Sequence, residues 1–180
     1  MIDMIYQTLN QCIDTIAHSY TNFVQDPGKD FTRNRSLTFK KVILLLLKMG
    51  GQSLSRELLN CQETISNSAF VQSRYKIKAE ALKELFQLFV QAIRPVQELP
   101  ILAVDGSDIH IPCMPDDPDS YFPSKNGGKS YSLLHLNALF DLNHQIYYDA
   151  LVQKRRQYDE RQALIDMMEA SPFRPSPRYR

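Results

Sequence analysis

An aspartate directly after a short apolar run is the first candidate for chemistry in this sequence. Asp105 follows the apolar residues 101–104, which lie between Pro100 and Gly106. Such a run is typical of a buried strand, and a carboxylate at its end is costly unless it is hydrogen-bonded, paired or bound to a cation. Two interpretations stay open: Asp105 binds a divalent metal at the mouth of the strand, or it opens a turn by accepting backbone hydrogen bonds around Gly106.

Charge is strongly segregated along the chain, although the formal net charge is only +1. Residues 33–94 carry 11 basic and 4 acidic side chains, whereas residues 95–153 carry 2 and 8. A basic block beside an acidic block predicts a part that binds a polyanion next to a part that binds a cation, although charged runs are also common on solvated faces.

Helical periodicity dominates the first half of the chain. Apolar spacing predicts helices over residues 1–20, 39–49, 54–61, 66–76 and 79–94. The two short helices 54–61 and 66–76 resemble a helix-turn-helix, and a plain bundle with a polar outer face is the alternative. In the first case the second helix faces the DNA major groove or its phosphates with its polar and basic residues: Ser66, Asn67, Ser68, Gln72, Arg74 and Lys76.

Alternating patterns after Pro100 predict strands over residues 107–111, 131–141 and 145–153, with a hairpin turn at 143–144 and a helix from Asp159 onward. His110 and His135 could approach Asp105 in such a sheet, although a lone strand histidine is more often structural. The longest strand divides into two faces, with Leu134, Leu136, Ala138 and Phe140 on one and Leu133, His135, Asn137 and Leu139 on the other.

This order of elements predicts a mixed α+β or α/β protein. Residues 1–95 form a helical, helix-turn-helix-like DNA-binding region, residues 96–170 form an incomplete ribonuclease H-like domain with three strands, an antiparallel hairpin and one helix, and residues 171–180 form an unstructured tail. No sequence remains for the parallel strand and the further helices of a ribonuclease H-like fold, which predicts an exposed sheet edge.

Composition argues against several other classes of protein. The longest apolar run, 42–47, is too short to cross a bilayer, and the start has no basic region of a secretory signal, so a cytoplasmic location without a membrane partner is expected. The three cysteines are widely spaced and predict neither a disulfide framework nor a zinc site. Gly128-Lys129-Ser130 lacks the earlier glycine of a phosphate-binding loop.

Several stretches together resemble bacterial DDE transposases of the insertion-sequence-four family. Residues 102–108 (LAVDGSD), 131–142 (YSLLHLNALFDL), 147–153 (YYDALVQ) and 159–161 (DER) are similar to the first part of their catalytic domain. Residues 31–59 and 68–76 are similar to their N-terminal DNA-binding region. The resemblance spans roughly residues 30–170, and its specificity lies in the combination of these stretches.

The resemblance implies cut-and-paste transposition by three carboxylates that hold two divalent cations, Mg²⁺ or Mn²⁺. Asp105 matches the first carboxylate, as a catalytic residue and metal ligand, whereas the second carboxylate and the glutamate of the later Tyr/Arg/Glu/Lys helix have no counterpart. One carboxylate cannot hold two metals, so we expect a truncated chain that does not catalyse strand transfer by itself.

The partner that the resemblance implies is DNA, at the ends of the element and in the target, and a homodimer is left open. Two other hypotheses remain: a non-enzymatic DNA-binding protein such as a transposition inhibitor, and an unstable fragment without function. Combined with the basic block, the resemblance predicts that DNA is contacted by Arg33, Arg35, Lys40, Lys41, Ser68, Gln72, Arg74 and Lys76.

Overall fold

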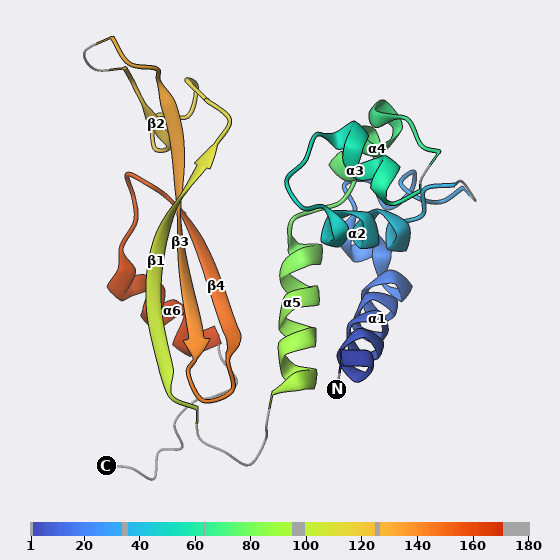
Figure 1. The fold of residues 1–180 in the computed structure, drawn as a ribbon, viewed down its shortest axis with the longest axis horizontal. Helices are drawn as coiled ribbons and strands as arrows, with labels where there is room; N and C mark the ends of the chain where they lie inside the picture. The colour runs from blue at the N-terminus through green and yellow to red at the C-terminus, as the bar shows by residue number, and fades with distance from the viewer. Residues whose placement is uncertain (1, 34–35, 63, 95–99, 125–126, 171–180) are drawn as a thin grey trace. The chain divides into compact units, whose positions relative to one another are not determined.

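The computed structural model describes residues 2–33, 36–62, 64–94, 100–124 and 127–170, and the predictions for Arg35 and for the tail 171–180 concern residues outside these ranges. The chain divides into two compact units, Met1–Ile93 and Arg94–Arg180. The first unit is helical, and the second contains a four-stranded antiparallel sheet and a helix (Figure 1). This confirms the mixed class and the order of helices before strands. The ribonuclease H-like and helix-turn-helix arrangements stay predictions.

The first unit consists of helices whose bounds differ from the expected ones by only a few residues. Thr38 caps the second helix by accepting a hydrogen bond from the backbone N–H of Lys41, and Ser66 caps the fourth in the same way through Ala69. The elements are α1 (Ile2–His18), the 3₁₀ turn η1 (Tyr20–Phe23), α2 (Phe39–Lys48), α3 (Leu54–Asn60), α4 (Asn67–Tyr75) and α5 (Glu80–Ile93).

Helix α2 joins two hydrophobic cores. On one side Phe39 and Ile43 pack with residues of α1 and α5, which lie side by side (Figure 1). On the other side Val42 and Leu45 pack with Leu58 of α3 and Phe70 of α4. The second core is the only apolar anchor described for the two short helices, which are too short to be stable alone.

The sheet of the second unit is built around its longest strand. Strand β3 (Tyr131–Asp141) pairs on one side with β1 (Leu102–Ile111) and on the other with β4 (Ile146–Lys154) and the short β2 (Tyr121–Phe122). Helix α6 (Glu160–Ala170) packs on β3 and β4. The strands at 131–141 and 145–153 and the helix after Asp159 were therefore predicted correctly, whereas the short strand β2 was not predicted.

The two faces of this sheet differ in what covers them. Leu139 and Tyr148 are buried against Met167 of α6, and we call this the covered face. The face that carries Leu134, Leu136, Ala138 and Phe140 is contacted by no helix in the described part of the second unit, and we call it the uncovered face. The alternation in the sequence assigned these residues to their faces correctly.

The expected end of a strand at Asp105 is wrong. Strand β1 continues through Asp105 and Gly106 to Ile111, and both residues pair with β3, opposite Ala138 and Asn137. Neither a strand mouth nor a turn lies at Asp105. Among the described residues, no helix combines the length and the apolar character needed to cross a membrane.

Candidate functional site

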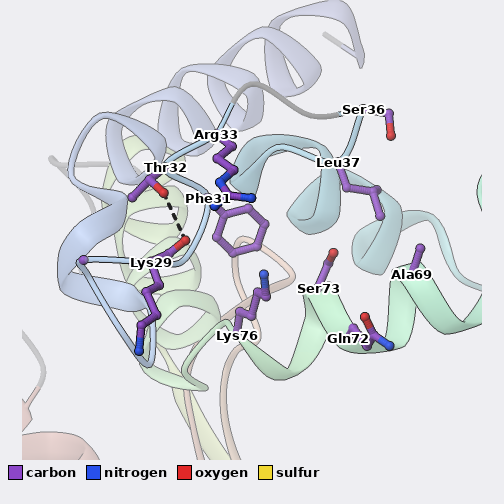
Figure 2. A pocket seen from close by; sticks show the side chains of 11 residues that line it. Lys29, Phe31, Thr32, Arg33, Ser36, Leu37, Ala69, Gln72, Ser73 and Lys76 are labelled. Atoms are coloured by element: carbon purple, nitrogen blue, oxygen red, sulfur yellow. Dashed lines mark hydrogen bonds between the residues drawn. The ribbon is translucent and has the colours of Figure 1, made fainter.

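Cationic side chains of the first unit gather around one cavity of about 400 Å³. We call it the cationic pocket. Its charged lining residues are Lys29, Arg33 and Lys76, and no carboxylate lines it. Figure 2 shows these three side chains around Phe31, with Gln72 and Ser73 projecting from α4.

Backbone pairing holds the loop 26–33 beside the end of α4. Val24 and Ile77 form an antiparallel bridge, flanked by hydrogen bonds from the N–H of Gln25 to the carbonyl of Lys76 and from the N–H of Lys78 to the carbonyl of Phe23, both 2.8 Å long. This short ladder fixes two segments about fifty residues apart in sequence. It explains why Lys29 and Arg33 meet Lys76 in one pocket.

Phe31 turns the chain at the floor of the pocket. Its φ of 57° lies in the left-handed region, which is unfavourable for an aromatic residue unless packing compensates. Here the ring packs against both cores and meets Phe39 edge-on, with ring centroids 5.8 Å apart. The Lys76 ammonium lies 5.8 Å from the centroid of the same ring. The packing of the Phe31 ring therefore compensates for the strained backbone and anchors the loop that carries Arg33.

The three cations of the pocket differ in how far they are neutralised. Lys29 pairs with Asp26 at 3.2 Å, and this contact lowers the pKa of the Asp26 carboxyl. Lys76 lies 3.6 Å from the buried Asp30. Arg33 is exposed and pairs with no carboxylate of the described residues. Arg33 is therefore the cation of the pocket whose charge is least neutralised by carboxylates, and an anion in the pocket would interact with it most strongly.

The structure brings together part of the predicted DNA-contacting set. Arg33, Gln72 and Lys76 line the cationic pocket. The other described members lie elsewhere: Ser68 is exposed in the first turn of α4, Arg74 lies over the Tyr75 ring, Lys40 pairs with Asp14, and Lys41 lies in the first turn of α2, where its backbone N–H donates to the capping side chain of Thr38.

Asp105 is exposed on the uncovered face of the sheet. Its Oδ1 accepts a hydrogen bond from the N–H of Gly106 at 2.9 Å. Its register partner on β3 is Ala138, which faces Ala150 of β4. Asp105 therefore does not lie at the mouth of a buried strand, where the metal-binding interpretation places it.

The surroundings of Asp105 do not fit a site for two divalent cations. Such a site needs several carboxylates or imidazoles at one place. The carboxylates of Asp108, Asp141 and Asp149 belong to positions on the opposite face, and His135 lies there as well, so it does not approach Asp105. Across the described ranges of the chain, no group of three or more metal-ligating side chains is found.

A buried histidine joins polar groups on the covered face instead. His135 is 5% exposed, and its Nδ1 lies 2.7 Å from the carboxylate of Asp108. The Nε of Arg155 lies 2.8 Å from the same carboxylate, and the Arg155 guanidinium lies 4.1 Å from the centroid of the Tyr158 ring. These bonds, first that of His135 and then that of Arg155, lower the pKa of Asp108.

Gly106 makes room for this network. A Cβ at Gly106 would lie 2.5 Å from Nε2 of His135 and 3.2 Å from Oε1 of Glu160. Glu160 begins α6, and its Oε1 is 3.4 Å from Nε2 of His135. The sequence alone placed both Asp108 and His135 on strands. That their side chains meet could not be predicted, because it depends on the register of β1 on β3.

The comparisons with known proteins identify no family. No family model matches the chain, and neither a curated protein nor a solved structure does. The likeness to insertion-sequence transposases therefore depends only on the sequence stretches described above.

Proposed function

We propose that the helical unit binds duplex DNA and that the cationic pocket receives a backbone phosphate. The observation that carries this proposal is the convergence of Lys29, Arg33 and Lys76 on a cavity that no carboxylate lines. Phosphate contacts of lysine and arginine supply most of the affinity of DNA-binding proteins and fix their register on the duplex.

Helix α4 supplies the part of this surface that can read bases. Gln72 is exposed on α4 and lines the same cavity as Lys76, while Ser68 is exposed one turn earlier. A glutamine side chain can pair with an adenine edge in the major groove, whereas a phosphate held by Arg33 and Lys76 would position the helix. Base contacts made by a helix that phosphate contacts hold in position are typical of the recognition helix in a helix-turn-helix.

Salt-dependent binding of a fluorescein-labelled duplex of about 25 base pairs tests the proposal. Between about 50 and 200 mM salt, Arg33→Ala should weaken binding and reduce the slope of log K against log salt by about 1, because one phosphate contact is lost. Lys83→Ala is the matched control, since Lys83 is an exposed cation of α5 outside the pocket. Absence of binding at the lowest salt, or equal slopes for both variants, would refute the proposal.

The wider assignment is that this DNA binding serves a transposase of the insertion-sequence-four family. Its support is the combined resemblance of residues 30–170. The second candidate is a DNA-binding protein without catalysis, such as a transposition inhibitor, and the isolation of Asp105 from other carboxylates favours it. Nicking of supercoiled plasmid by the purified chain with Mg²⁺ or Mn²⁺ would support a catalytically active transposase and contradict the expected truncation. Duplex binding without nicking would agree with a chain that does not catalyse, as expected both for the truncated transposase and for the inhibitor.

A further inference from the structure

The second unit carries an aromatic and cationic cavity that the duplex-binding proposal does not use. It has a volume of about 550 Å³ and is lined by Asp108, Phe122, Tyr131, Leu133, Arg155 and Arg156. We call it the hairpin pocket, because its lining comes from β1, β2, β3 and the segment after β4. A volume of this size is within the range of pockets for small organic ligands.

Stacked rings form one wall of the hairpin pocket. Phe122 and Tyr131 are direct cross-strand partners, with ring centroids 5.3 Å apart and planes inclined by 11°. His110 of β1 lies on the same face, its ring 5.9 Å from that of Tyr131. The Tyr131 side chain remains 42% exposed. Burial therefore contributes little to the stability of this stacked pair. Such a ring offers a flat apolar surface to a planar ligand.

Two guanidinium groups also line the hairpin pocket, those of Arg155 and Arg156. Arg156 lies 4.8 Å from the centroid of Phe122, and its Nε and Nη2 both donate to the carbonyl of Tyr121, at 3.2 and 3.0 Å. The group is therefore held in place before any ligand binds. Arg155 is held by Asp108. The lining thus carries two cations against one carboxylate, and that carboxylate is already bonded to Arg155 and His135.

We infer that the hairpin pocket binds an unpaired nucleotide of a nucleic-acid strand, with its base stacked on Tyr131 and its phosphate on Arg156. Aromatic rings beside arginines are the usual platform for single strands, because every base has a face that can stack. In a duplex both faces of a base are covered by its neighbours, so only an unpaired or extruded base can reach such a ring. The inference goes beyond duplex binding by the first unit, and it depends on different residues.

A tryptophan reporter tests this inference directly. The chain contains no tryptophan, so Tyr131→Trp introduces a single one and keeps the stacking surface. A single-stranded oligothymidylate of about 12 nucleotides should quench its fluorescence to saturation, and a duplex of the same length should not. Tyr147→Trp is the matched control, because Tyr147 is 56% exposed on the uncovered face and should show no saturable quenching.

Binding of the labelled oligothymidylate, followed by anisotropy, provides the second measurement. Tyr131→Ala should weaken it about 5- to 150-fold, the effect of losing one stacked base, whereas Tyr131→Phe should retain it. Arg156→Gln should weaken it and lower its salt dependence. Circular dichroism identifies a misfolded Tyr131→Ala variant, in which case the tryptophan reporter and Tyr131→Phe decide.

Three results would overturn the inference: no saturable quenching of the Tyr131→Trp variant, equal quenching of both tryptophan variants, or quenching by free thymidine monophosphate as strong as by the strand. The last result would assign the pocket to free nucleotides. The duplex assay reports separately on the first unit, because Tyr131→Ala should leave duplex binding unchanged and Arg33→Ala should weaken it. Failure of one proposal is therefore distinguishable from failure of the other.

Discussion

The two faces of the sheet in the second unit are formed by the same strands but differ in burial and in hydrogen bonding. On the covered face, Leu139 is 1% exposed beneath α6, and the polar network of His135 continues the packing toward the hairpin pocket. On the uncovered face, Val152 is 53% exposed, and Asp105 bonds only to its neighbour's N–H among the hydrogen bonds of the described residues. Carboxylates three positions apart on β1 thus have opposite surroundings.

This difference shows what decides the role of a strand carboxylate. Asp105 and Asp108 are equally acidic residue types in one strand, yet only Asp108 meets a histidine and an arginine from other elements. The cause is the two-residue period of a strand, which places them on opposite faces, and the helix that covers only one face.

Truncation of a side chain should show the largest difference in the free energy of unfolding between the two faces. Leu139→Ala removes a side chain that is buried against α6, and it should lower the free energy of unfolding by about 2–5 kcal/mol. Val152→Ala, on the uncovered face, should change it by no more than about 0.5 kcal/mol. Urea unfolding of both variants measures the difference. Equal losses would mean that something covers the second face as well.

A methyl group at Gly106 should disturb the covered face alone. Gly106→Ala places a Cβ 2.5 Å from Nε2 of His135, whose ring is buried and bonded to Asp108, so the ring cannot move away freely. We expect a loss of about 1–3 kcal/mol in the free energy of unfolding, typical of overpacking. Ser107→Ala, on the uncovered face, is the control and should cost little in the same thermal or urea melts.

Much of this architecture could be predicted from the sequence, because hydrophobic period and turn residues are local signals. The helix bounds, the strand 131–141 and its two faces follow from them. The continuation of β1 through Gly106 did not, since glycine usually interrupts a strand, and here it is kept because His135 of the neighbouring strand needs the space. The cationic pocket was not predicted: Arg33, Gln72 and Lys76 were named only as DNA contacts, and their convergence with Lys29 depends on the non-local pairing of residues 23–25 with 76–78.

Lowering the pH should reduce the stabilisation that the Asp108 carboxylate gives to the covered face. The pKa of Asp108 is lowered by its bonds to His135 and Arg155, so this carboxylate stabilises the fold above the ordinary aspartate pKa of about 3.9. That contribution is lost as pH falls through the lower pKa of the folded state. Asp108→Asn should therefore have a lower Tm than the wild type at pH 7, and the gap should narrow below about pH 4. A gap that is constant with pH would contradict this assignment.

The smallest effect is expected for Asp105 itself. Because its carboxylate is exposed and no other carboxylate shares its face of the described strands, Asp105→Asn should leave Tm unchanged, and Mn²⁺ in the millimolar range should not raise the Tm of the wild type. A ligand that binds only the folded state would raise it by mass action. If Mn²⁺ stabilised the wild type and not Asp105→Asn, Asp105 would be a metal ligand after all. The uncovered face would then be the catalytic face that the resemblance to transposases implies, and its lack of a covering helix would reflect access to that site.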